Sequence, residues 1–122
     1  MCTISLLLLS TLITLQCDTF IMEYDKVSGT LINCKKNDRL IDEMVYRYQQ
    51  VDTIFLCASY NYPGDYYESA SAGVAFDLYM KLSEQLKFTT VELCKTQSMY
   101  PGTFFSTKKL PPDKIIIEVK YE

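Results

Sequence analysis

The sequence contains no histidine and only four glycines and four prolines. Without histidine, every catalytic system in which histidine activates a serine or cysteine nucleophile is excluded. The glycines never gather into a loop that could hold a phosphate, and no Cys-X-X-Cys pair suggests a redox motif or a zinc site. We therefore expect a protein that is not an enzyme and that uses no metal and no cofactor.

Charge excludes a further class of partner. The chain has 12 basic and 15 acidic residues, a formal net charge of −3, and its lysines are scattered pairs rather than a stripe. Nucleic-acid binding depends on clustered basic residues, so no nucleic-acid partner is expected. Among the carboxylates, Asp65 with Glu68 is the pair to inspect for general acid–base chemistry, but a solvated loop is the favoured interpretation of this pair.

An uncharged apolar run opens the sequence. It covers residues 4–15 and ends abruptly at Gln16, Cys17 and Asp18. It is too short to span a bilayer about 30 Å thick as a helix, and its position is typical of a secretory signal. We expect residues 1–17 to be a signal peptide and residues 18–122 a single secreted, extracellular domain with no stable membrane insertion after cleavage. A buried N-terminal element or an uncleaved anchor is the alternative.

The number of cysteines predicts one disulfide. Cleavage after Cys17 leaves Cys34, Cys57 and Cys94, whereas cleavage before Cys17 leaves four cysteines, and the count alone does not choose between them. With three cysteines, one thiol is spare or pairs with another chain. Cys57 lies in the most apolar run, which suggests a thiol that fills the core. This leaves a disulfide between Cys34 and Cys94 as the expected pairing.

Periodic apolar residues predict the elements of the domain. Residues 20–34 suggest a first strand or hairpin, and residues 38–50 a helix that Asn37 or Asp38 caps. The run 51–58 is typical of a buried central strand, residues 60–67 of a loop, and residues 69–87 of a second helix. On the outer sides of the two helices, Glu43 with Arg47 and Asp77 with Lys81 are expected to form ion pairs one turn apart. Strands are expected at 88–95, 103–106 and 115–121. This order predicts an α/β or α+β fold, a two- or three-layer sandwich with a small mixed sheet and two main helices.

Tyrosine is the residue that the sequence over-uses, with 10 in 122 positions. Four of them surround the loop that follows the expected central strand, where ligands gather in open α/β sheets. Tyrosine combines a rigid apolar ring with a polar tip, which suits recognition, although such clusters also cover the ends of a core. The candidate binding residues, extended by the tyrosine that precedes Pro101, are Tyr60, Tyr62, Asp65, Tyr66, Tyr67 and Tyr100.

Two stretches resemble known families. The first resembles the opening helix of thioredoxins, and Leu31 stands where the first cysteine of their redox pair belongs; the residues that carry it are Cys34, Lys35, Leu40, Ile41, Asp42, Glu43, Tyr48, Gln49 and Ile54. The second is similar to the first strand and helix of periplasmic-type ligand-binding domains, through Ile54, Tyr62, Pro63, Gly73, Phe76, Asp77, Leu78, Leu82, Leu86 and Phe88. Both resemblances imply an α/β fold.

Three functions follow as expectations. The first is a small secreted module, not an enzyme, that binds another protein through the tyrosine-rich loop. The alternatives are an extracellular carrier of a small ligand and a thioredoxin-like protein that lacks a complete redox pair.

Overall fold

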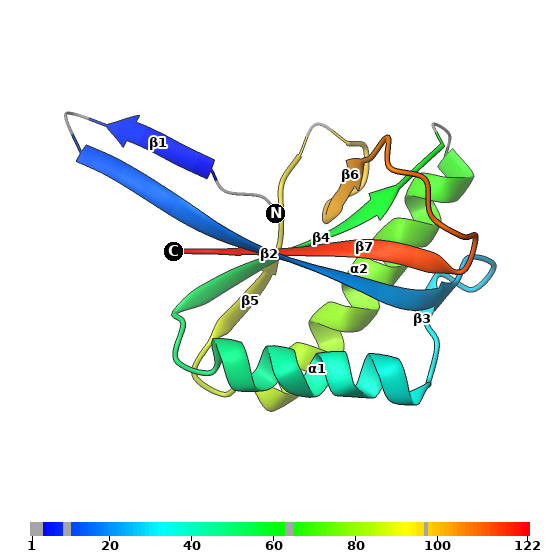
Figure 1. The fold of residues 1–122 in the computed structure, drawn as a ribbon, viewed down its shortest axis with the longest axis horizontal. Coiled ribbons are helices and arrows are strands. Elements are labelled where there is room, and N and C mark those ends of the chain that lie inside the picture. Colours follow the sequence, from blue (N-terminus) through cyan, green and yellow to red (C-terminus); the bar gives the residue numbers. More distant parts are fainter. Residues whose placement is uncertain (1–3, 9–10, 63–64, 97) are drawn as a thin grey trace.

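A mixed β-sheet and two helices make up the molecule (Figure 1). The computed structural model describes residues 4–8, 11–62, 65–96 and 98–122. The helices are α1 (Lys35–Tyr48) and α2 (Asp65–Gln85). The strands are β1 (Ile4–Leu8), β2 (Thr11–Asp25), β3 (Thr30–Leu31), β4 (Thr53–Tyr60), β5 (Thr90–Leu93), β6 (Thr103–Phe105) and β7 (Lys114–Tyr121).

The last strand of the chain lies inside the sheet. The order is β1-β2-β7-β4-β5, so β7 separates β2 from β4, as Figure 1 shows. β7 is antiparallel to both of its neighbours, whereas β5 and β6 run parallel to β4 along its other edge. β4 is therefore an interior strand of a mixed sheet, which confirms the prediction for residues 51–58 and for the sheet type.

One face of the sheet carries the core. Residues directly opposite each other in neighbouring strands share a face, and Phe20 pairs with Ile117 while Leu56 pairs with Val119. The buried residues of this face pack in one cluster with residues of both helices: Phe20, Met22, Ile54, Leu56, Ala58, Ile115, Ile117 and Val119 from the strands, and Ile41, Met44, Tyr48, Val74, Ala75, Leu78 and Leu82 from the helices. Both helices thus cover the same face, and the fold is a two-layer α+β sandwich.

Helix α1 begins earlier than its apolar pattern predicts. The residue before its first turn is Cys34, which makes no side-chain cap, and neither Asn37 nor Asp38 caps the helix. Asn37 is instead buried inside the first turn, where its side chain bonds to β2. The predicted ion pair between Glu43 and Arg47 on the outer side of the helix is confirmed.

Helix α2 also begins earlier than predicted, at Asp65 rather than near residue 69. Tyr66 and Tyr67 therefore belong to its first turn and not to a loop. Farther along, Asp77 pairs with Lys81 at 2.6 Å, as predicted, and its second carboxylate oxygen accepts the N–H of Leu31 at 2.9 Å. This bond ties α2 to β3.

The predicted first hairpin is present, but its first strand is longer than expected. β2 extends back to Thr11, and its residues 11–15 pair with β1, whereas pairing with β7 starts at Gln16. Figure 1 shows the hairpin of β1 and the first part of β2 projecting from the rest of the molecule. No helix in the described part of the chain is long and apolar enough to cross a membrane.

The disulfide joins Cys57 to Cys94, so the predicted pairing of Cys34 with Cys94 is wrong. β4 and β5 are parallel neighbours in which Leu56 pairs with Leu93, and the next residues of the two segments are the two cysteines. Their Cα atoms lie 5.6 Å apart, within the range that a disulfide spans. Cys34 lies at the start of α1 as a free, half-buried thiol, and Cys17 is also disulfide-bonded.

Candidate functional site

Tyrosine side chains gather where β4 ends and α2 begins. Tyr60 is the last residue of β4, Tyr62 follows it, and Tyr66 and Tyr67 lie in the first turn of α2. β4 ends at Tyr60 and α2 begins at Asp65, and the ring of Tyr62 contacts the ring of Tyr67. The structure therefore brings together the four tyrosines that the sequence singled out.

Three of these rings form an exposed row. The ring centroids of Tyr62 and Tyr67 lie 5.2 Å apart, and those of Tyr66 and Tyr67 lie 5.3 Å apart in an edge-to-face arrangement. The side chains of Tyr62, Tyr66 and Tyr67 are 57%, 53% and 37% exposed. Aromatic pairs at this distance attract each other by about 0.5–1.5 kcal/mol, which fixes the rings while their faces remain open to solvent.

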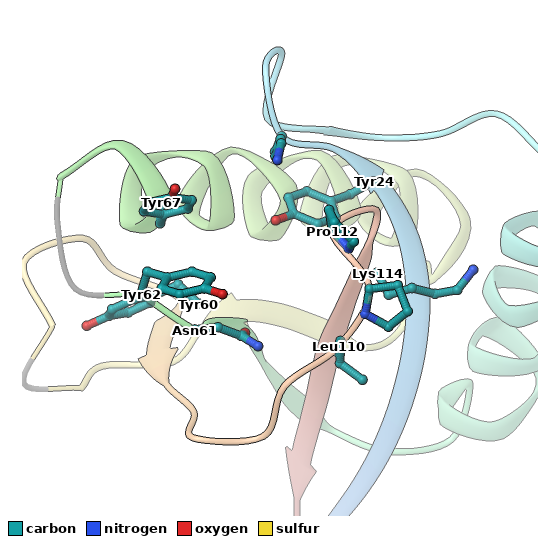
Figure 2. A pocket seen from close by; sticks show the side chains of 10 residues that line it. Tyr24, Tyr60, Asn61, Tyr62, Tyr67, Leu110, Pro112 and Lys114 are labelled. Carbon is teal, nitrogen blue, oxygen red and sulfur yellow. The ribbon is translucent and has the colours of Figure 1, made fainter.

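A pocket of about 240 Å³ lies beside this row (Figure 2). Figure 2 shows tyrosines from β2, from the end of β4 and from α2 around one space. The described residues that line it are Tyr24, Lys26, Tyr60, Asn61, Tyr62, Tyr67, Leu110, Pro111, Pro112 and Lys114. We call Tyr24, Tyr60, Tyr62, Tyr66 and Tyr67 the tyrosine surface.

Sequence reasoning missed Tyr24 because it lies 36 positions before Tyr60, in a different strand. Tyr24 lies near the end of β2, just before the turn of residues 26–29. β2 and β4 are both antiparallel to β7, so the C-terminal ends of these two strands lie at the same end of the sheet. Burial raises the pKa of the Tyr24 hydroxyl above its ordinary value, and the nearby Tyr66 and Tyr67 raise it further. Tyr24 therefore presents a neutral hydroxyl to the pocket.

The rim of the pocket is held by specific contacts. The Tyr60 ring meets Phe105 of β6 edge to face, with centroids 5.7 Å apart, and its hydroxyl lies 3.1 Å from Ser98 Oγ. Asn61 Nδ2 donates to the carbonyl oxygen of Lys108 at 2.6 Å. The bond from Asn61 ties the segment that leads to Leu110, Pro111 and Pro112 to the end of β4.

The charged residues among the described lining of the pocket are both lysines. Lys26 is exposed on the turn after β2, and Lys114 at the start of β7 pairs with Glu23 at 3.3 Å. Because Glu23 offsets the charge of Lys114, the positive charge at the mouth of the pocket comes from Lys26, although the chain as a whole is acidic.

Two of the predicted binding residues, Asp65 and Tyr100, do not belong to the tyrosine surface. Asp65 is the first residue of α2, and its side chain lies outside the described part of the structure. Tyr100 is half-buried, does not line the pocket, and its backbone N–H donates to Glu68 Oε2 at 2.9 Å. Glu68 thus holds the loop after β5 against α2, which gives this carboxylate a structural role.

Known proteins add no further information about the site. Neither a family model, nor a curated protein, nor a solved structure matches this chain. No group of three or more His, Cys, Asp or Glu residues within the described ranges is arranged to hold a metal ion.

Proposed function

We propose that this chain is a secreted module that binds another protein through the tyrosine surface. The observation that carries the proposal is the row of Tyr62, Tyr66 and Tyr67, whose rings contact one another while 37–57% of each side chain is exposed. Rings that are already fixed lose little conformational entropy on binding, and tyrosines are enriched among the residues that dominate interface energies.

The size of the pocket favours a protein partner over a small ligand. Its volume of about 240 Å³ is below the 300–1,000 Å³ that is typical of small-molecule sites. A single side chain of a partner fits such a space better than a free ligand does. The carrier alternative instead requires a ligand enclosed by the domain.

Two features support secretion. The Cys57–Cys94 disulfide is typical of oxidising compartments. Residues 4–8 pair with residues 11–15 within the projecting hairpin. Removal of residues 1–17 therefore takes away this hairpin and the two pairs that Gln16 and Cys17 make with β7, and it leaves the β2–β7 pairing from Asp18 onward in place. We infer that residues 1–17 are removed on export.

The first experiment tests export. The full chain is expressed in eukaryotic cells, and the protein collected from the medium is sequenced from its N-terminus. A new N-terminus near Asp18 is expected, whereas intact Met1 on intracellular protein with all thiols reduced would contradict secretion.

The second experiment tests the surface. The secreted protein is crosslinked to intact cells and the captured proteins are quantified for wild type, for Tyr62→Ala/Tyr66→Ala and for Tyr46→Ala. Tyr46 is an exposed tyrosine on α1, at 78%, and serves as the matched control. A partner should be captured by wild type and Tyr46→Ala and lost with the double variant, because truncation of central tyrosines weakens binding at least about tenfold. Equal capture by all three proteins would contradict the proposal.

The two alternatives make different predictions. A carrier should retain a small molecule that mass spectrometry detects after denaturation of the purified protein. A thioredoxin-like protein should reduce insulin disulfides, and Cys34→Ser should abolish that activity because Cys34 is the free thiol of the described chain.

A further inference from the structure

A second hollow adjoins the tyrosine pocket. It lies between the turn after β2 and helix α2, and its described lining is Lys26, Val27, Ser28, Gly29, Tyr66, Ser69, Ala70 and Gly73. Lys26 lines both hollows, and the contacting rings of Tyr66 and Tyr67 belong one to each. The two hollows are therefore neighbours, with Lys26 common to both.

Backbone atoms and small side chains form the base of the second hollow. An added Cβ on Gly29 would lie 3.3 Å from the carbonyl oxygen of Ala70, so the turn and the helix touch here through their main chains. Val27 stands on the rim with 82% of its side chain exposed. The hollow above this base is open and has a volume of about 720 Å³, which is ample for an apolar side chain of a partner.

Lys26 supplies the positive charge of the two hollows, because Lys114 is paired with Glu23 at 3.3 Å. Among their described lining residues the charged ones are Lys26 and Lys114. The neighbouring carboxylate of Asp25 is held in the turn, where its Oδ1 accepts the N–H of Val27 at 2.8 Å, and it is not among the described lining residues of either hollow. A partner that covers this surface therefore brings Lys26 against its own chain, and carboxylates there are favoured.

We propose that the partner enters as an extended, acidic peptide segment. In this binding mode one apolar side chain occupies the tyrosine pocket, a second lies in the hollow beside Val27, and a carboxylate close to them pairs with Lys26. Two adjacent hollows with a shared cation fit a linear segment, whose side chains project at regular intervals, better than they fit a single compact ligand. This inference rests on the proposed function and names the partner's chemistry.

Fluorescence anisotropy with labelled peptide pools tests the proposal on the secreted protein. Three pools share random positions filled with Leu, Val, Phe or Pro, and their intervening positions carry Asp and Glu, Lys and Arg, or Ser and Gly. The acidic pool should bind most tightly, and its affinity should fall as salt rises because exposed charge pairs are screened. Equal binding of the acidic and basic pools would overturn the proposal.

A charge reversal with a matched control locates the contact. Lys26→Glu should weaken binding of the acidic pool about five- to tenfold, whereas Lys36→Glu, which reverses an exposed lysine on α1, should leave it unchanged. Equal effects of the two variants would mean that only net charge matters, and the assigned contact would be wrong.

The peptide-pool result and the cellular-capture result together show whether this inference fails alone or the proposed function fails with it. If no pool binds while the cellular partner is still lost with Tyr62→Ala/Tyr66→Ala, the partner uses a folded surface, and only the acidic segment is wrong. If the acidic pool binds equally to wild type and to Tyr62→Ala/Tyr66→Ala, the tyrosine surface is not the site and both proposals fail.

Discussion

Gly73 of α2 meets Gly29 of the turn after β2 so closely that no side chain fits between them. A Cβ added to Gly73 would overlap the carbonyl oxygen of Gly29. Gly29 itself has a φ of 68°, a conformation that glycine adopts without the steric cost that a Cβ brings. This contact fixes the turn that carries Lys26 and Val27 against the helix that carries Tyr66 and Tyr67.

Gly73→Ala should therefore destabilise the domain although alanine is the better helix former. The overlap with backbone should cost up to about 3 kcal/mol, and alanine recovers roughly 1 kcal/mol of helix propensity, so we expect the free energy of unfolding to fall by up to about 2 kcal/mol. Thermal unfolding followed by circular dichroism measures the change. Ser83→Ala, at an exposed position of the same helix, is the control and should be neutral or slightly stabilising. A higher melting temperature for Gly73→Ala would show that the contact is loose.

Replacement of Tyr62 and Tyr66 by alanine should leave the melting temperature almost unchanged. Both side chains are more than half exposed, so their loss removes little buried area. Tyr60→Ala should instead lower the melting temperature by several degrees, because it removes the ring contact with Phe105. If the melting temperature of the double variant is as low as that of Tyr60→Ala, the rings of Tyr62 and Tyr66 are part of the core, and they do not form a binding surface.

Removal of the Cys57–Cys94 disulfide should affect stability far more than removal of the free thiol of Cys34. Cys57→Ala/Cys94→Ala opens a loop defined by a sequence separation of 37, and the chain-entropy estimate for such a loop is about 4 kcal/mol. Denaturant unfolding should show this loss, while Cys34→Ser should unfold like wild type. Peptide mapping without reduction should recover Cys57 linked to Cys94, and a Cys34–Cys94 fragment would refute the observed pairing.

Asn37 should be among the most sensitive polar residues. It is 1% exposed, its Oδ1 accepts the N–H of Glu23 at 3.0 Å, and its Nδ2 donates to the carbonyl oxygens of Glu23 and Ile32. Asn37→Ala removes a buried acceptor from the N–H of Glu23, so a loss of about 1–3 kcal/mol is expected in denaturant unfolding. The exposed neighbour Asn33 provides the control, and a loss no greater than that of Asn33→Ala would contradict the role of these bonds.

Ionisation of the Tyr48 hydroxyl should lower the stability of the protein at alkaline pH. Burial raises the pKa of its hydroxyl well above the ordinary value of 10.0, and the bond that it donates to Asp18 Oδ2 at 2.6 Å raises it further. The folded state holds this proton at a pH where the unfolded chain has lost it, so the contribution is complete below about pH 9 and is lost as pH rises above 10.

The free energy of unfolding should accordingly fall from about pH 9 to 11 in wild type and fall less steeply in Tyr48→Phe. Tyr46→Phe, which removes an exposed hydroxyl from the same helix, should keep the slope of wild type. Urea titrations at several pH values measure both slopes. Identical slopes for wild type and Tyr48→Phe would contradict a buried, hydrogen-bonded hydroxyl.

The pattern of apolar residues predicted the elements well where one side of an element is buried. The stripe of Ile41, Met44 and Tyr48 does line the core, and the run around Leu56 is an interior strand. Helix starts were predicted less well, because the first turns of α1 and α2 consist mainly of polar residues and exposed tyrosines. Their position depends on contacts such as those of Asn37 with β2, which no local pattern contains.

Local patterns in the chain were sufficient to predict the fold class, the ion pairs along the helices and the group of tyrosines after β4, because each depends on residues near one another in the sequence. The disulfide, the two-layer arrangement and the place of Tyr24 in the pocket depend instead on how the elements assemble. Strand register and the order of strands bring distant residues side by side, and they arise from packing of the whole sheet rather than from the preference of any segment.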